Sequence, residues 1–295
     1  MNMKSRKIKS AVFPVAGMGT RFLPATKASP KEMLPIVDKP LIQYAAEEAV
    51  DAGIENLIFI TGRNKFSIPN HFDKAYEIET ELERRNKKSE LELVQNIIPN
   101  NINCIYIRQS QALGLGHAVL CSKAAVGDNP FAVILADDMI LSSKGCLSQM
   151  VERYDDLNSS IVAVEKVEKN LLHKYGIIDG TVNKNNKDWS LSNIVEKPDN
   201  DNAPSNMGVV GRYILNPSIF NILEKTQKGA GGEIQLTDAI ATQILNEDVF
   251  AYEFEGKRFD CGNKLGFLEA TIQYGLNHNE LSNDLKEYLR NLNLD

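Results

Sequence analysis

Apolar and amphipathic segments alternate along the first half of the chain, which is the pattern that strands and helices produce in a layered α/β fold. Two helices are expected in this half, one over Leu41–Ala52, ended by Gly53, and one near His117–Ala125. The charged stretch Asp73–Val94 has few apolar positions, so we expect a solvated helical excursion there. The buried strands expected from short apolar runs are Ile8–Val15, Leu57–Thr61, Asn103–Arg108 and Phe131–Ala136.

Beyond Ser159 the chain is richer in short β-type segments, which are joined by polar turns such as Asn183–Asp188. No Pro-, Gly- or Ser-rich linker precedes this part, so we expect it to extend the same sheet as a mixed, β-rich addition. Residues 1–295 are therefore expected to form one domain, with a first half over about 8–158, a second over about 159–263 and C-terminal helices over 264–295. The strands expected after Ser159 are Ile161–Val167, Tyr175–Val182, Leu191–Val195 and Val209–Leu215, and the helices are Ser218–Thr226, Glu233–Asn246, Lys264–Leu276 and Asp284–Leu292.

Composition excludes several classes of function for this 295-residue chain. A hydrophobic content of 43% is enough for a sizeable core, yet the longest wholly apolar run, Phe131–Ala136, is far shorter than the roughly 20 residues of a membrane span. The formal net charge of −6 is not that of a nucleic-acid or membrane-surface binder. Four widely spaced cysteines and the lack of a visible signal peptide favour a cytoplasmic protein without a disulfide framework or zinc site.

A glycine loop, Ala16–Gly19, follows the first expected strand. Glycines let backbone N–H groups approach phosphate oxygens closely, so the loop is a candidate anion-binding site. It matches neither of two familiar phosphate loops, because Phe22 stands where a dinucleotide fold needs a third glycine and the Gly-Lys-Ser/Thr of a Walker A loop is absent. Pro24 and Pro30 disfavour a helix here, and we expect an extended loop that lies along its ligand.

Cations close to the glycine loop change its interpretation. On its own, a G-x-G pair is more often a tight strand-to-loop turn than a ligand site. Arg21, Lys27 and Lys31 follow within a short, proline-stiffened stretch. Arginine offers phosphate oxygens a planar fork and lysine offers them a point charge. A loop with these cations suits a nucleoside triphosphate and its departing pyrophosphate.

A series of ordered motifs resembles those of the sugar-nucleotide pyrophosphorylases, and most closely those of bacterial members that use UTP and glucose 1-phosphate. The motifs are Gly17-x-Gly-Thr-Arg-x-Leu-Pro-x-Thr-Lys27, Ser29-Pro-Lys-Glu-Met-Leu-Pro35, Asp38-Lys-Pro40, Arg108-Gln109, Gly114-Leu-Gly-His-Ala118, Tyr175-Gly176, Glu196-Lys-Pro198, Glu233-Ile-Gln-Leu-Thr-Asp238 and Asp260-Cys-Gly-Asn-Lys264. The resemblance implies a Rossmann-like nucleotidyltransferase fold. In it, a mixed, mainly parallel central sheet is flanked by helices and carries a small β-rich sugar-binding extension. Residues 8–158 would then be the nucleotide-binding half and residues 159–263 the sugar-binding half.

The same resemblance implies roles for residues at the matching positions. Arg21 and Lys31 would hold the triphosphate and, together with Lys197, would be the catalytic residues. Uracil offers an N3–H donor and carbonyl acceptors, so a Glu or Gln side chain can recognise its edge. The nucleotide-binding residues implied are Ala16, Gly17, Gly19, Thr20, Glu32, Gln109 and Gly114, and the sugar-binding residues are Gly176, Glu196, Lys197 and Val209.

Mg²⁺ is the implied cofactor, held by Asp137 and Asp260. This hard cation prefers oxygen ligands and is often bound by one or two carboxylates together with substrate phosphates. Asp137 follows an expected strand, and Asp260 ends a β-type run that begins near Val249. The family's usual Pro-Asp pair is Ala-Asp-Asp here. Because neighbouring residues of an extended chain point in opposite directions, we expect Asp138 to cap the following loop instead of binding metal.

The implied reaction is an in-line attack by the phosphate of glucose 1-phosphate on the α-phosphorus of UTP, which releases pyrophosphate. The nucleophile is already ionised and needs no general base, so His117 is expected at a helix start near the base pocket and not in the chemistry. Two alternatives stay open, namely the same chemistry with dTTP and a non-catalytic regulatory relative. A glycosyltransferase is disfavoured because Asp137-Asp138 lacks the D-x-D spacing. We expect a homodimer or homotetramer.

Overall fold

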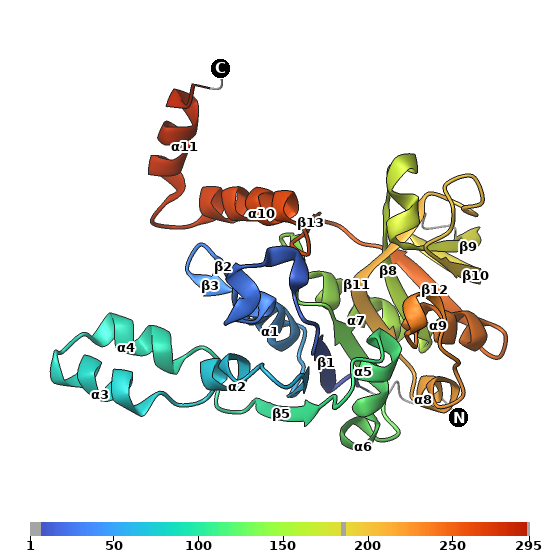
Figure 1. The fold of residues 1–295 in the computed structure, drawn as a ribbon, viewed down its shortest axis with the longest axis horizontal. Coiled ribbons are helices and arrows are strands. Elements are labelled where there is room, and N and C mark those ends of the chain that lie inside the picture. The colour runs from blue at the N-terminus through green and yellow to red at the C-terminus, as the bar shows by residue number, and fades with distance from the viewer. Residues whose placement is uncertain (1–6, 184–186, 294–295) are drawn as a thin grey trace.

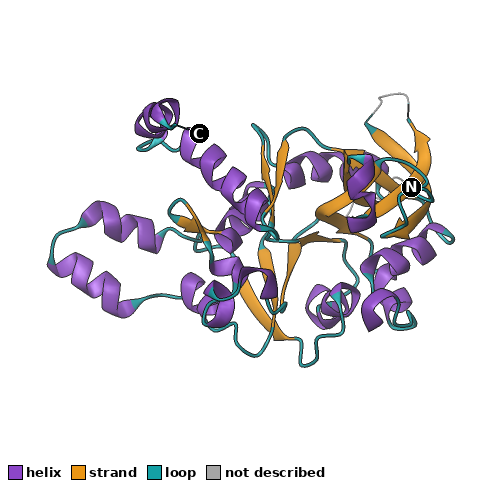
Figure 2. Ribbon diagram, turned by 45° about the horizontal axis from the view of Figure 1, so that its top comes forward, coloured by secondary structure: helices purple, strands orange, loops and turns teal. Residues whose placement is uncertain are grey.

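The computed structural model describes residues 7–183 and 187–293, and its centre is a nine-stranded sheet with helices on both sides (Figures 1 and 2). The expected turn at Asn183–Asp188 lies partly outside the described residues. The order across the sheet is β5-β4-β1-β6-β11-β8-β12-β10-β9. The strands are β1 (Ser10–Val15), β4 (Asn56–Thr61), β5 (Asn103–Arg108), β6 (Phe131–Ile134), β8 (Ser160–Lys166), β9 (Gly176–Val182), β10 (Asp188–Glu196), β11 (Met207–Leu215) and β12 (Val249–Glu253).

Parallel pairing is confined largely to the first half of this sheet. Strand β1 lies parallel to β4 and to β6, and β5 continues the parallel set beyond β4. Strand β11 is antiparallel to both β6 and β8, and β10 is antiparallel to β12 and β9. In the second half only β12 lies parallel to a neighbour, β8, among the described residues, so this half is the mixed addition that was expected, and the sheet as a whole is less parallel than predicted because β11 runs opposite to β6.

The helices cover both faces of the sheet, and two small two-stranded sheets stand beside it. Helix α1 begins after Pro40 and ends at a left-handed glycine, Gly53, with φ 85°. The α-helices are α1 (Leu41–Asp51), α2 (Ser67–Phe72), α3 (Tyr76–Arg84), α4 (Lys88–Gln95), α5 (Leu115–Cys121), α6 (Lys123–Val126), α7 (Cys146–Leu157), α8 (Ser218–Leu223), α9 (Leu236–Ile244), α10 (Lys264–Asn277) and α11 (Ser282–Asn291). The small sheets pair β2 (Pro35–Ile36) with β3 (Lys39–Pro40) and β7 (Asp138–Leu141) with β13 (Lys257–Asp260). The 3₁₀ helices are η1 (Thr20–Phe22), η2 (Ala25–Lys27), η3 (Lys31–Met33), η4 (Lys169–Lys174) and η5 (Ala230–Gly232).

Three expected elements differ from those observed. The helix near His117–Ala125 is two short helices, α5 and α6, which meet at Ser122. The expected strand over Phe131–Ala136 ends at Ile134, after which the chain turns into β7. The β-type run from Val249 to Asp260 is two strands in different sheets, because Gly256, with φ 143°, breaks the run between β12 and β13.

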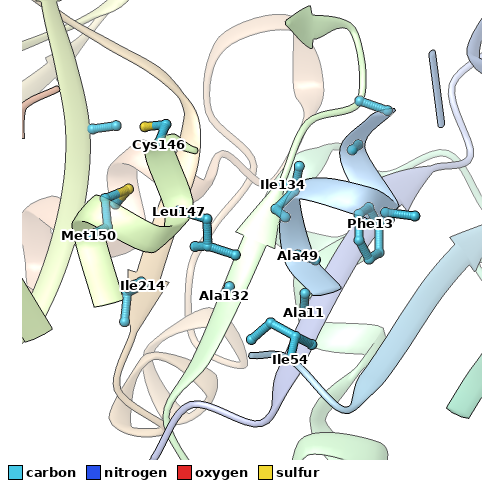
Figure 3. Close-up of a cluster of buried hydrophobic side chains, with 14 of the residues drawn as sticks. Ala11, Phe13, Ala49, Ile54, Ala132, Ile134, Cys146, Leu147, Met150 and Ile214 are labelled. Carbon is cyan, nitrogen blue, oxygen red and sulfur yellow. The ribbon is translucent and has the colours of Figure 1, made fainter. Parts of the chain in front are cut away.

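The core lies on both faces of β1, because successive side chains of a strand point to opposite sides. Ala11 and Phe13 face α1 and α7, whereas Val12 faces the side covered by α5, α8 and α9. Figure 3 shows part of the first cluster, where Ala132 of β6 lies near Leu147 of α7. Because the side chains of this central strand point alternately to its two sides, they contribute to two apolar layers, and a different set of helices packs against each layer.

Two helical segments project from this body. The α3–α4 pair forms a hairpin at one end of the molecule, and α10 and α11 extend from another side (Figure 1). Inside the hairpin, Gln95 Nε2 donates a hydrogen bond of 3.0 Å to Glu79 Oε2. Among the described residues no helix is long and apolar enough to cross a membrane.

A buried ion pair joins α1, α7 and β11 on the first face. Arg212 of β11 is 2% exposed, and its Nη2 lies 2.7 Å from Glu48 Oε2 of α1. Glu48 also accepts the backbone N–H of Leu147, at 2.9 Å, in the first turn of α7. Burial alone would lower the pKa of Arg212, but the Glu48 carboxylate raises it above its ordinary value.

Glu48→Ala is expected to lower the free energy of unfolding by about 3–5 kcal/mol, because it leaves the buried Arg212 guanidinium uncompensated. Urea denaturation followed by circular dichroism measures the change. Glu47→Ala is the matched control, since Glu47 pairs with Lys39 at 2.9 Å on the exposed side of the same helix. A loss within about 1 kcal/mol is expected for it. Equal losses in the two variants would contradict a structural role for the buried pair.

Candidate functional site

A cavity of about 1160 Å³ lies at the carboxyl ends of β1 and β6 and reaches across to the second half of the chain. Open α/β sheets commonly bind their ligands at this edge. Among its lining residues are predicted site residues from both halves, namely Gly17, Gly19, Thr20, Arg21, Lys31, Asp137, Gly176, Glu196, Lys197, Val209 and Asp260. Positions remote in sequence therefore share one space.

The glycine loop is more compact than the extended segment that was expected. After Gly19, which has φ 67°, the chain forms the successive 3₁₀ turns η1, η2 and η3. The backbone N–H of Phe22 bonds to Gly19 O at 3.1 Å, and Thr26 Oγ1 donates to the same oxygen at 2.7 Å. Pro24 and Pro30 exclude a continuous α-helix but are compatible with short turns. These turns bring Arg21 and Lys31 to the cavity.

Lys31 and Asp137 form an ion pair in the cavity. Lys31 Nζ lies 2.5 Å from Asp137 Oδ2, and about a quarter of each side chain is exposed. Burial alone would lower the pKa of Lys31 and raise that of Asp137. Their mutual attraction outweighs burial, so the pKa of Lys31 is raised and that of Asp137 is lowered. Both groups stay charged at neutral pH.

The two predicted metal ligands converge beside Gly262. A Cβ at Gly262 would stand 2.8 Å from Asp260 Oδ1, 3.0 Å from Asp137 Oδ2 and 3.3 Å from Arg21 Nη1. Only glycine leaves this point open, between two carboxylates and a guanidinium. In the part of the chain that the structure describes, no three His, Cys, Asp or Glu side chains form a complete metal cluster. Two carboxylates fit a hard cation that takes its other ligands from substrate phosphates and water.

Asp138 was expected to cap the following loop. It instead begins β7, and it is buried. Its Oδ1 accepts hydrogen bonds from Arg258 of β13, at 2.8 Å from Nε and 2.5 Å from Nη2. Its Oδ2 accepts the backbone N–H of Gly211 in β11 at 2.7 Å. Burial raises the pKa of Asp138, and Arg258 offsets only part of that rise. Sequence reasoning missed this contact because the partners lie far apart along the chain.

At the end of the cavity that the second half of the chain forms, Lys197 follows β10 with a left-handed backbone, φ 45°. Its backbone N–H donates to Tyr175 O at 3.0 Å, and its Nζ lies 3.0 Å from Glu196 Oε1. Gly176 lies close by, since a Cβ there would stand 3.2 Å from Thr237 Cγ2 and 3.4 Å from Glu196 Oε2. Polar side chains and a half-exposed ammonium thus surround this end of the cavity.

Four predicted nucleotide-binding residues, Ala16, Glu32, Gln109 and Gly114, lie near the cavity but not among its lining residues. Glu32 is 2% exposed and forms an ion pair of 2.7 Å with Lys65, which is itself buried. Burial raises the pKa of Glu32, and the attraction of Lys65 counteracts it only in part. Gln109 follows β5 and bonds through Nε2 to Gly114 O at 3.2 Å.

Several lining residues were not singled out from the sequence, chiefly Arg258, Gly262, Gly211 and Thr237. A usable signal existed for Arg258, because residues two apart in a strand share a face and Arg258 stands two before Asp260. Gly262 belongs to one of the motifs named above. The sequence could not show that a side chain there would meet Asp137 and Arg21, because both lie far away along the chain. Gly211 carried no sequence signal, because its N–H donates to Asp138, which lies 73 positions away along the chain.

Comparison with known proteins finds matches over nearly the whole chain. The model of the family described as nucleotidyl transferase matches residues 11–275. A UTP–glucose-1-phosphate uridylyltransferase of Bacillus subtilis is 49% identical over 289 residues, covering 97% of this chain and 98% of that protein. One of Staphylococcus epidermidis is 47% identical over 289 residues, covering 98% of this chain and 100% of that protein.

Solved structures give the same picture. A UTP-bound UGPase from Acinetobacter baumannii superposes with a TM-score of 0.91 at 46% identity, covering 97% of this chain and 100% of that chain. A UDP-glucose pyrophosphorylase complexed with UDP-glucose has a TM-score of 0.84 at 48% identity, covering 92% of this chain and 100% of that chain. Likeness of this degree extends over nearly the whole fold.

The left-handed backbone of Lys197 yields a stability prediction. Because a side chain disfavours positive φ and glycine does not, Lys197→Gly is expected to be about 1 kcal/mol more stable than Lys197→Ala. Lys174, in η4, is the control position, where the order should reverse because glycine is less favourable than alanine in a helical turn. Urea unfolding of the four variants measures both differences. If alanine were more stable than glycine at both positions, the backbone at Lys197 would be shown to be unstrained.

Proposed function

Because the chain belongs to the nucleotidyl transferase family, we propose that it joins UTP to glucose 1-phosphate, forming UDP-glucose and releasing pyrophosphate. The resemblance seen in the motifs is confirmed by near-full-length relatives named UTP–glucose-1-phosphate uridylyltransferase and by a solved UDP-glucose pyrophosphorylase. The observation that carries the proposal is the single cavity that joins the cationic glycine loop, two carboxylates and Lys197. That set of groups matches two phosphorylated substrates that must be held together.

In this proposal the first half binds the nucleotide. Backbone groups of Ala16 and Gly17 face the base, and Gly19 and Thr20 carry the loop past the phosphates. A side chain at Gly17 would meet nothing within 4 Å, so the ligand has room beside it. Gln109 and Gly114 complete the base pocket. Glu32 forms part of its wall, because its carboxylate is already paired with Lys65.

The second half binds the sugar phosphate. Lys197 grips the phosphate, and the Glu196 carboxylate accepts hydrogen bonds from sugar hydroxyls, with Gly176 and Val209 lining the sugar. The phosphate oxygen of glucose 1-phosphate attacks the α-phosphorus of UTP, and pyrophosphate departs on the opposite side. The nucleophile is anionic, so catalysis consists of positioning and charge neutralisation. Arg21 and Lys31 neutralise the charge that develops on the leaving pyrophosphate.

The proposal includes Mg²⁺ held by Asp137 and Asp260. One carboxylate oxygen of each lies within 3.0 Å of the position that a Cβ of Gly262 would take, so both face the same space, and carboxylate oxygens are the ligands that a hard cation prefers. When bound, Mg²⁺ would reduce the repulsion between the phosphates of the two substrates. Asp138 is left out of this set because both of its oxygens are occupied by Arg258 and Gly211.

Self-association stays a prediction. Helix α10 exposes Leu265, Leu268 and Ile272, and Leu281 and Tyr288 are exposed in and next to α11. Apolar side chains gathered on projecting helices are consistent with contact between copies of the chain. A homodimer or homotetramer remains the expected assembly.

The proposed reaction is tested by measuring pyrophosphate release from UTP, dTTP, CTP and ATP, each with glucose 1-phosphate. UTP is expected to give the highest kcat/KM. Arg21→Ala tests whether the release depends on this site. Its kcat should fall about a hundredfold or more with an unchanged melting temperature, because it removes one charge-stabilising donor. Release from none of the four triphosphates would favour a non-catalytic regulatory relative, and a preference for dTTP would transfer the assignment to thymidylyl transfer.

The metal assignment is tested by titrating Mg²⁺ against turnover in three variants. Asp137→Asn and Asp260→Asn are each expected to lower kcat about a hundredfold or more and to raise the Mg²⁺ concentration that gives half-maximal rate. Asp138→Asn should instead lower the melting temperature and leave that Mg²⁺ concentration unchanged, because its contacts are with Arg258 and Gly211. If only Asp138→Asn raised the Mg²⁺ concentration needed for half-maximal rate, Asp138 and not Asp137 would be the ligand, and the assignment made here would be wrong.

A further inference from the structure

The side-chain amide of Gln109 has both of its N–H groups engaged. Gln109 directly follows β5, is 8% exposed and is anchored by its backbone N–H, which donates to Thr61 O at 2.9 Å. Its Nε2 lies 3.2 Å from Gly114 O and 3.0 Å from His117 Nδ1. A primary amide carries two donors on nitrogen and one acceptor on oxygen. Both donors are therefore used inside the protein.

The carbonyl of Gly114 is fixed in place, and it is the first of two acceptors that together hold the amide in one orientation. Gly114 has φ 101°, and a Cβ there would stand 2.7 Å from Glu233 Cβ and 2.8 Å from Ile234 O. The loop is also tied to Ile234, whose carbonyl accepts the N–H of Gly116 at 2.9 Å. Because a carbonyl oxygen can only accept, Nε2 of Gln109, and not Oε1, must face it.

His117 supplies the second acceptor through Nδ1. It lies in the first turn of α5, one turn before Cys121, whose Sγ is 3.9 Å from the same nitrogen. Because Nδ1 of His117 and the carbonyl of Gly114 accept the two N–H groups of Gln109, Oε1 is the polar atom of this amide that is left for another partner. Within residues 7–183 and 187–293, Oε1 of Gln109 accepts no hydrogen bond. The amide of Gln109 therefore has an acceptor left for a further partner and no donor.

We propose that His117 is a positioning residue that keeps Gln109 an acceptor toward the base and thereby favours UTP over CTP. The inference rests on the proposed function, in which Gln109 belongs to the base pocket. N3 of uracil carries a hydrogen and can donate to Oε1, whereas N3 of cytosine is an acceptor and would face Oε1 without a bond. Thymine has the same N3–H as uracil, so this device does not separate UTP from dTTP.

The test compares His117→Leu, which removes the acceptor, with His117→Asn, whose side-chain oxygen can stand near the position of Nδ1. The ratio of kcat/KM for UTP to that for CTP, with glucose 1-phosphate saturating, is expected to fall about tenfold in His117→Leu, which is the worth of one hydrogen bond of about 1.4 kcal/mol. His117→Asn should retain most of the ratio. The change should appear in the KM for nucleotide, with the KM for glucose 1-phosphate unchanged. Cys121→Ala is the control and should keep the wild-type ratio.

Calorimetric binding of UTP and CTP to the same variants measures the base preference without turnover. A wild type that binds UTP in preference to CTP but releases no pyrophosphate would overturn the proposed reaction and leave the role of His117 standing. A folded His117→Leu protein with the wild-type preference would overturn the role of His117. Equal losses of preference in His117→Leu and His117→Asn would also overturn it, since a lost acceptor would not be the cause.

Discussion

The carboxylate of Asp138 is the contact on which the candidate site depends. It is buried at the start of β7, receives Arg258 from β13 and accepts the N–H of Gly211 from β11. Burying a carboxylate is costly unless it is paired and hydrogen-bonded, so the contact forms only when all three strands are in register. Asp138 and Asp260 are paired residues in the β7–β13 ladder. The register that satisfies Asp138 therefore also sets the separation of Asp137 from Asp260.

The cavity holds its charges in pairs. Lys31 is paired with Asp137, and Lys197 with Glu196, although the whole chain carries a net charge of −6. An anion that draws Lys31 away leaves the Asp137 carboxylate unpaired, and a cation that takes Asp137 leaves Lys31 unpaired. If the proposed anion and cation bind here, each of them would make the other bind more tightly, by the same free energy in both directions. Paired groups keep a highly charged site stable until its ligands arrive.

Local features of the sequence predicted most of the strands and the place of the glycine loop but not the conformation of that loop, and contacts between distant segments account for much of what was missed. The strand over Asn103–Arg108 was expected with its observed bounds, because an apolar run carries its own signal. The break near Gly256 was missed, because a single glycine also occurs inside strands. Arg258 and Asp138 are 120 positions apart, and Glu32 and Lys65 are 33 apart, so neither pair has a local pattern. The direction of β11 likewise depends on which strands it meets.

The hairpin of α3 and α4 connects β4 to β5, and two parallel neighbours need only some crossover between them. Its helices contact mainly each other, and none of its residues lines the cavity. An insertion or deletion within this hairpin therefore removes no residue from the lining of the cavity and no pairing from the sheet. The length of the hairpin can therefore change without altering the register of β4 with β5, which sets the position of Gln109.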